Sequence, residues 1–175
     1  TRDSYARSVI EGNYIGTDAT GTRALPNGGR GITFDLPASE FDVTNNLISG
    51  NVRSGVFIAG AYDILLSGNT ISANSAGVFL GPETSTIMVR RNSIAGNAQF
   101  GVAVSPEAKR FDLIDNSITR NGFIGIDRGL NGFDGYDSDE ADVTRAKIPP
   151  PHVTSATFNP AVNTTTILGT YNNSY

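Results

Sequence analysis

The amino-acid sequence predicts an all-β fold, a right-handed parallel β-helix solenoid of about five coils. The main observation is the pattern Asn-x-Ile-x-x-Asn, which recurs as NLISGN, NTISAN, NSIAGN and NSITRN from Asn46, Asn69, Asn92 and Asn116. The first asparagines are 23, 23 and 24 residues apart, and a constant period of this length indicates stacked repeats. Each repeat holds three short segments of alternating apolar residues, which leaves no room for a helix.

The composition agrees with a chain of short strands and turns. Of the 175 residues, 20 are glycine, none is cysteine, and only 17% are charged. The net charge of −4 argues against a nucleic-acid partner, because phosphate binding needs a basic surface. No apolar run approaches the roughly 18 residues of a membrane span, so we expect no membrane insertion. The lack of cysteine excludes disulfides and cysteine-based zinc sites.

In each repeat, one strand precedes the first asparagine and another follows the second. The preceding segments begin at Phe41, Ile64, Ile87 and Phe111, and the following segments begin with Gly31, Gly55, Gly77, Gly101 and Gly125. Three short strands separated by Gly, Asn and Ser corners make up one coil of a parallel β-helix, in which successive coils stack at about 4.8 Å.

The first coil is irregular. Asn13 and Ile15 take the places of the repeated Asn and Ile, and Asn27 matches Asn51. An excursion of roughly ten residues therefore lies between Ile15 and Asn27. Insertions in solenoids form loops on one face, often a functional face, but we expect a structured corner without a ligand here.

Alternation assigns three inward columns that form the core. The column of repeated isoleucines contains Ile15, Ile48, Ile71, Ile94 and Ile118. The strand before the asparagine contributes Phe41, Val43, Ile64, Leu66, Ile87, Val89, Phe111 and Leu113. The strand after the glycine contributes Ile32, Phe34, Val56, Ile58, Val78, Leu80, Val102, Val104 and Ile126.

The repeated asparagines form columns of their own. Asparagine tolerates the left-handed backbone that a sharp corner needs. Its side-chain amide can also bond the equivalent asparagine of the next coil, which makes a ladder. We therefore expect these asparagines to be structural and not catalytic.

Three regions are predicted along the chain: a parallel β-helix over residues 1–130, an acidic exit loop and Pro-rich linker over 131–151, and a β-hairpin over 152–175. The hairpin is expected because VTSATF and TTTILGTY alternate apolar and polar residues across an NPAVN turn. It either caps the last coil or begins a β-sandwich module cut short by the end of the sequence. The chain starts without Met or a signal peptide, which indicates a processed or excised piece with adjoining domains of a larger chain.

Over roughly residues 8–128, the phrases GNYIGTDATGTRALPNGGRGI and NxIxxN…GV resemble bacterial extracellular right-handed β-helix repeat proteins of the pectin-lyase-like fold. The resemblance implies a secreted or cell-surface location. It leaves the activity open, because this fold hosts polysaccharide lyases, hydrolases, epimerases, phage tailspikes and adhesins. A leucine-rich repeat also permits this period, but it needs a Leu-bearing convex segment where this chain has SANSAGVFLGPETST.

Outward positions are the expected places for binding. Between the inward residues of the strand after the glycine lie Thr33, Phe57, Phe79, Ala103 and Asp127. Phe57 and Phe79 are expected to be exposed one coil apart, and exposed aromatic rings suit sugar stacking or a protein partner. The alternative is that a loop or the C-terminal hairpin covers them.

The candidate catalytic residues are Asp112, Asp115, Arg90 and Arg91. A lyase acting on acidic sugars needs several carboxylates that bind calcium and an Arg or Lys base on one face, and these residues are the nearest approximation. Arg91 and Asp115 hold equivalent places in successive coils, so we expect a surface ion pair between them. His152 is the only histidine and has no base partner, which excludes a Ser-His-Asp triad.

The exit loop is the candidate metal site. It holds Asp134, Asp137, Asp139 and Asp142, together with Glu140. Clustered carboxylates repel one another unless they bind a hard cation such as calcium. The spacing differs from that of an EF-hand, and the alternative is a solvated acidic linker.

These observations favour a non-catalytic extracellular or cell-surface segment that acts as a structural spacer, an adhesin or a glycan-binding surface. Its expected partners are polysaccharides or other cell-surface components. The alternative is part of a polysaccharide lyase or glycoside hydrolase acting on acidic polysaccharide. Five coils make a stack roughly 24 Å long, which is short for cradling an oligosaccharide and favours the non-catalytic function.

Overall fold

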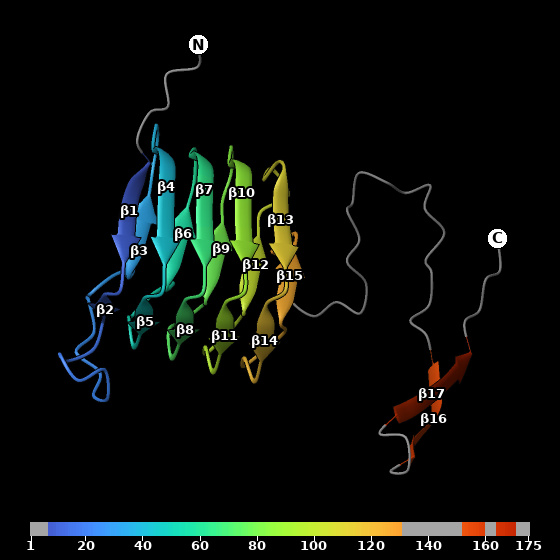
Figure 1. The fold of residues 1–175 in the computed structure, drawn as a ribbon. Coiled ribbons are helices and arrows are strands. Elements are labelled where there is room, and N and C mark those ends of the chain that lie inside the picture. Colours follow the sequence, from blue (N-terminus) through green and yellow to red (C-terminus); the bar gives the residue numbers. More distant parts are fainter. Residues whose placement is uncertain (1–6, 131–151, 160–163, 171–175) are drawn as a thin grey trace. The chain divides into compact units, whose positions relative to one another are not determined.

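The computed structural model describes residues 7–130, 152–159 and 164–170. The chain divides into two compact units, Thr1–Asp137 and Ser138–Tyr175, which are described separately. In the described part of the first unit, three parallel sheets surround one apolar core (Figure 1).

Each of the three sheets contains five strands. The first sheet contains β1 (Ser8–Glu11), β4 (Ser39–Thr44), β7 (Tyr62–Ser67), β10 (Ser85–Arg90) and β13 (Phe111–Ile114). The second contains β2 (Tyr14–Ile15), β5 (Leu47–Ser49), β8 (Thr70–Ser72), β11 (Ser93–Ala95) and β14 (Ser117–Thr119). The third contains β3 (Ile32–Phe34), β6 (Val56–Ile58), β9 (Val78–Leu80), β12 (Val102–Val104) and β15 (Ile126–Arg128).

Successive strands of the chain belong to successive sheets, and each strand pairs in parallel with the strand three places further on. This arrangement is a parallel β-helix, because the chain returns to the same sheet once in every coil. The predicted all-β solenoid is therefore confirmed.

The core is an aliphatic stack at the predicted positions. Ile48, Ile71 and Ile94 are fully buried and lie in register in neighbouring coils. Each coil thus buries its apolar side chains against two others, which an isolated coil could not do. The prediction for Ile126 is wrong, since its side chain is 49% exposed. Ile126 lies in β15, which has β12 as its single neighbour among the described strands.

Two asparagine ladders run along the stack, as predicted. The first ladder consists of Asn13, Asn46, Asn69, Asn92 and Asn116, and the second of Asn27, Asn51, Asn74, Asn97 and Asn121. In the first, the backbone N–H and the side-chain amide of each asparagine donate to Oδ1 of the next at 2.9–3.0 Å. The amide of Asn69 also donates to the carbonyl oxygen of Val43 in the preceding coil at 2.8 Å. These bonds satisfy polar groups that would otherwise be costly to bury.

We expected the ladder asparagine itself to be the left-handed residue of the corner. In the structure, the left-handed residue is instead the one before it. Gly12, Asn45, Gly68, Arg91 and Asp115, which precede the first ladder, have φ between 53° and 68°. The ladder uses both the backbone N–H and the side chain of the asparagine, so the chain makes its left-handed turn one residue earlier. Asparagine at the ladder position is needed for its amide and not for its tolerance of positive φ.

The excursion in the first coil is a structured corner. Thr17 and Ala24 form an isolated antiparallel bridge. Within this loop, the carboxylate of Asp18 accepts hydrogen bonds from the hydroxyl of Thr20 at 2.8 Å and from the backbone N–H of Thr22 at 3.1 Å. The pKa of Asp18 is lowered, mainly by the hydrogen bond from Thr20. The backbone donors lower this pKa further, and together these hydrogen bonds outweigh burial, which raises it.

The second unit contains an antiparallel hairpin of β16 (His152–Asn159) and β17 (Thr164–Thr170), which confirms the hairpin expected there. Its use as a cap or as the start of a module stays a prediction, and so do the three region boundaries. The exit loop and linker at 131–151 lie outside the described residues. Among the residues that are described, no helix is long and apolar enough to cross a membrane.

Candidate functional site

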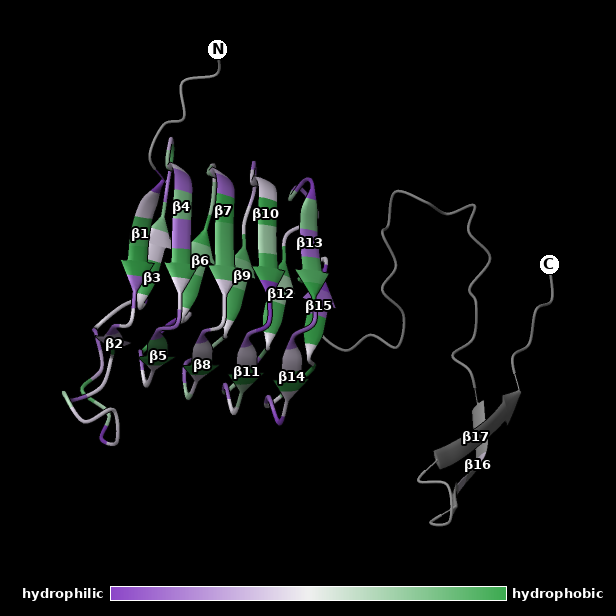
Figure 2. Cartoon of the chain, viewed as in Figure 1, coloured by the Kyte–Doolittle hydropathy of each residue, from purple (hydrophilic) through white to green (hydrophobic). Residues whose placement is uncertain are grey.

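A groove of about 790 Å³ lies on the outward face of the first sheet. It is lined by Arg7, Asp42, Asp63, Ile64, Leu65, Thr86, Ile87, Met88, Arg110 and Asp112. Leu65 and Met88 are half-buried and lie side by side in β7 and β10, where they form an apolar floor. In Figure 2 most of the β7 ribbon has hydrophobic colours, whereas β4 and β13 also carry hydrophilic residues.

One rim of the groove consists of polar residues that stand directly before the first inward residues of β7, β10 and β13. Asp63, Thr86 and Arg110 occupy this place and have φ of 54°, 59° and 50°. The next residues in β7 and β10, Ile64 and Ile87, are buried. Alternation therefore turns the side chains of the residues before them outward, where they line the groove.

An ion cluster around Arg7 closes one end of the groove. The Nε of Arg7 lies 2.6 Å from Oδ1 of Asp42, and its Nη1 lies 2.9 Å from Oδ1 of Asp63. Its Nη2 donates to the carbonyl oxygens of Phe41 and Asp63. Burial disfavours the charged guanidinium, but the hydrogen bonds and charges of Asp63 and Asp42 outweigh it and raise the pKa of Arg7. Arg7 precedes β1, so this cluster joins the first three coils.

The opposite end of the groove is open and carries Arg110 and Asp112. Both residues are exposed. Within the described part of the chain, neither side chain forms a hydrogen bond or an ion pair, in contrast to the Arg7 cluster. Their donors and acceptor oxygens are therefore available to a ligand.

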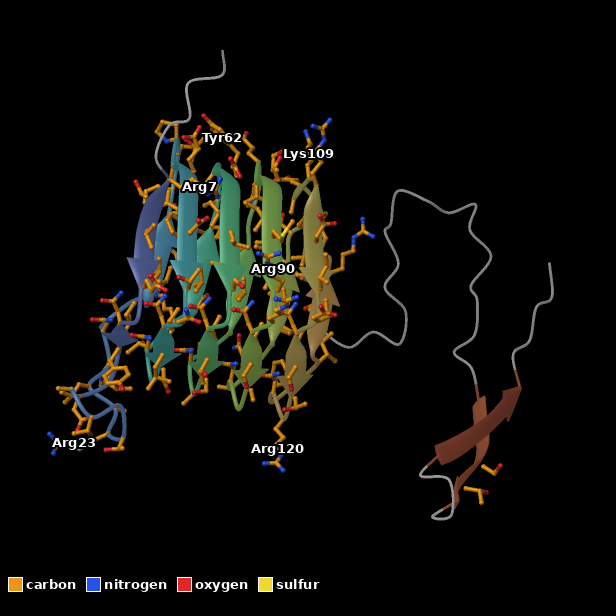
Figure 3. All side chains as sticks on the ribbon, in the orientation of Figure 1. Arg7, Arg23, Tyr62, Arg90, Lys109 and Arg120 are labelled. Carbon is orange, nitrogen blue, oxygen red and sulfur yellow. The ribbon has the colours of Figure 1, made fainter. Side chains whose placement is uncertain are left out.

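Of the four candidate catalytic residues, only Asp112 lines the groove. Arg90 lies further along the same strand face, in register with Ser67 and Ile114, and Figure 3 shows it near the middle of the view while Arg7 lies higher. The buried Nε of Arg90 has no hydrogen-bond partner among the described residues. No hydrogen bond or ion pair joins Arg90 to Asp112 within the same residues, so they do not form an acid–base pair in this structure.

The expected ion pair between Arg91 and Asp115 is wrong. The two residues do occupy equivalent corners, because β10 and β13 pair Arg90 with Ile114. Neither Arg91 nor Asp115, however, forms an ion pair with another described residue. Both Arg91 and Asp115 are exposed, where hydration and side-chain entropy offset the gain from pairing.

The two predicted aromatic ligand-binding residues lie on the third sheet, away from the groove. The rings of Phe57 and Phe79 stack with centroids 5.1 Å apart and planes inclined by 19°. The Cζ of Arg30 lies 3.4 Å from the centroid of Phe57, which is a cation–π contact. The expectation that both rings are exposed is wrong, because they are half-buried. Their outward column is also closed further on, where Ala103 and Asp127 are buried.

The predicted calcium ligands Asp134, Asp137, Asp139 and Asp142, like Glu140, lie outside the described residues, so calcium binding there stays a prediction. Among the residues that the structure does describe, no group of three or more His, Cys, Asp or Glu side chains is placed to hold a metal ion.

A family model for the right-handed β-helix region matches residues 3–143, which is more than half of the chain. The chain belongs to the right-handed β-helix family. This confirms the resemblance carried by the Asn-x-Ile-x-x-Asn repeats. No solved structure matches the chain. Membership in the β-helix family establishes the fold and leaves the activity open, because one fold can carry many functions.

The sequence analysis missed several groove residues, among them the charged Arg7, Asp63 and Arg110. A signal for these three was present. Glu40, Asp63, Thr86 and Arg110 are polar and recur at the period of the repeat, directly before an inward residue. Arg7 holds the same place in the first coil, because β1 and β4 pair Ser8 with Phe41. The excursion in the first coil lengthens the interval from Arg7 to Glu40 to 33 residues, which hides the period.

Proposed function

We propose that the chain is a non-catalytic β-helix segment of an extracellular or cell-surface protein and that the groove on its first sheet binds a glycan. The observation that carries this proposal is the apolar floor of Leu65 and Met88 beside the side chains of Arg110 and Asp112, which have no partner among the described residues. Ligand sites combine such an apolar surface with a few polar groups that fix orientation. A sugar ring offers C–H groups to the floor and hydroxyl groups to the guanidinium and carboxylate.

The charge of the groove favours a neutral glycan. Its lining contains two cations, Arg7 and Arg110, and three anions, Asp42, Asp63 and Asp112. Arg7 is already bound to two of these carboxylates, so one cation and one anion of this lining stay unpaired within the part of the chain that the structure describes. An acidic polysaccharide would be attracted by an excess of positive charge, which this groove does not have.

Affinity electrophoresis of the whole chain tests the proposal. The probes are gels that contain a soluble β-glucan, a mannan or homogalacturonan. We expect a neutral polysaccharide to retard the protein and the Asp112→Asn and Met88→Ala variants to lose most of the retardation. Asp115→Asn is the matched control, because Asp115 is an exposed carboxylate three residues further on that does not line the groove. An equal loss in Asp115→Asn, or no retardation by any of the three, would overturn the proposal and leave the spacer function.

An enzymatic function would use the same groove, since Arg110 and Asp112 lie in it together. To distinguish catalysis from binding alone, the protein is incubated with homogalacturonan and calcium. The formation of unsaturated or reducing sugar ends is then followed. Turnover that disappears in Asp112→Asn and persists in Asp115→Asn would replace the non-catalytic function with that of a lyase or hydrolase. We expect no turnover.

A further inference from the structure

The two terminal members of the second asparagine ladder are each followed by glycine. Asn27 precedes Gly28, and Asn121 precedes Gly122. The interior members are followed by residues with a side chain, Val52, Ser75 and Ala98. A glycine after asparagine has a specific chemical consequence, because it leaves the following backbone nitrogen without steric protection.

In an Asn–Gly pair, the backbone nitrogen of the glycine can attack Cγ of the asparagine side chain. The new N–Cγ bond closes a succinimide ring, the nitrogen loses its proton, and the Cγ–Nδ2 bond breaks with release of ammonia. Water then opens the ring to give aspartate or isoaspartate. The reaction needs a backbone N–H that is not engaged elsewhere and enough space for the ring to form.

The structure distinguishes the two pairs on both requirements. The N–H of Gly28 has no hydrogen-bond partner in the described part of the chain, Asn27 is exposed, and a Cβ added at Gly28 would meet no atom within 4 Å. By contrast, the N–H of Gly122 donates to the carbonyl oxygen of Asn97 at 2.8 Å. A Cβ at Gly122 would collide with the backbone of Ala98.

We infer that Asn27 is a site of spontaneous deamidation and that Asn121 is protected from it by the fold. The reaction removes the amide with which Asn27 donates to Oδ1 of Asn51 at 2.9 Å. The carboxylate that forms has no proton for this bond at neutral pH, so two acceptor oxygens face each other. Deamidation therefore breaks the second ladder at its first contact and loosens the attachment of the first coil.

Timed incubation of the whole folded chain at mildly alkaline pH, followed by peptide mapping with isoaspartate detection, tests this inference. We expect aspartate and isoaspartate to accumulate in the peptide that contains Asn27, while the peptide that contains Asn121 stays unchanged. In the chain unfolded by denaturant, both peptides should react. A third pair, Asn131–Gly132, lies outside the described residues and is followed in its own peptide.

Two variants sharpen the test. Gly28→Ala should slow the reaction at Asn27 severalfold, and Gly29→Ala should leave it unchanged, since a Cβ meets open space at both positions and neither has positive φ. Both Asn27→Asp and the protein aged by incubation should have a lower thermal unfolding midpoint than the fresh protein. The inference is overturned if Asn27 reacts no faster than Asn121 in the folded chain, or if Gly28→Ala reacts as fast as Gly29→Ala.

Discussion

The outward faces of the first and third sheets differ, although the same coils build both. On the third sheet, Phe57 and Phe79 stack on each other and Arg30 covers one ring, so the face is filled by its own side chains. On the first sheet, the next strands along the chain place Leu65 and Met88 at the floor of an open groove. Stacking fixes what points inward in a β-helix, whereas the size and pairing of outward side chains decide whether a face closes or can bind a ligand.

Replacing one interior ladder asparagine should destabilise the β-helix that carries both faces. In Asn69→Ala, the backbone N–H and the amide of Asn46 lose their shared acceptor, and the carbonyl oxygen of Val43 loses a donor. Leaving these buried groups unpaired should lower the free energy of unfolding by about 3 kcal/mol or more.

Denaturant unfolding measures this loss, and Asn13→Ala is the matched control. Asn13 is the exposed first member of the same ladder and donates to Asn46 without accepting from another ladder asparagine that the structure describes. Its replacement should cost about 1 kcal/mol or less. Equal losses in the two variants would mean that the ladder contributes no more in the interior than at its end.

A double-mutant cycle tests whether the outward side chains of the third sheet stabilise one another. Phe57→Ala and Phe79→Ala should show a coupling energy of about 0.5–1.5 kcal/mol, because their rings are stacked at 5.1 Å. The same cycle with Leu65→Ala and Met88→Ala should give a smaller value. These two residues lie in register on the groove face of the same coils. A larger coupling in the Leu65–Met88 pair would reverse the contrast between the faces.

The repeat predicted most of the fold because its signal lies in the inward residues. Ile48, Ile71 and Ile94 recur at a fixed period and are buried for the same reason in every coil. The period also predicts that Ile126 is buried, but this residue is exposed because the described stack ends at its strand. A periodic pattern states which side chain points inward, but burial also requires a neighbouring coil on each side.

The groove was harder to predict, because its residues are outward and differ from coil to coil. Asp112 was a candidate because of its carboxylate, but its place beside Met88 and Arg110 in a hollow depends on the outward side chains that neighbouring coils supply. The error on Phe57 and Phe79 has a related cause. Alternation places both rings outward, and it cannot show that they stack on each other or that Arg30 reaches one of them.

The smallest expected effects concern two arginines, Arg7 on the first sheet and Arg30 on the third. Arg7→Ala should lower the free energy of unfolding by about 0.5–1 kcal/mol, because its ion pairs with Asp42 and Asp63 are partly exposed. Arg7→Lys should recover only part of this loss, since an ammonium group lacks the fork that reaches both carboxylates.

The salt dependence of stability distinguishes the Arg7 ion cluster from the cation–π contact of Arg30 on the third sheet. Added salt screens ion pairs, so the difference between Arg7→Ala and the unchanged protein should shrink as ionic strength rises. Arg30→Ala should show a weaker salt dependence, because Arg30 lies over the ring of Phe57 and no ion pair of Arg30 occurs among the described residues. Unfolding midpoints at low and high salt measure both. If the two variants respond equally to salt, Arg7 does not hold the closed end of the groove by charge, and the first face differs from the third in shape alone.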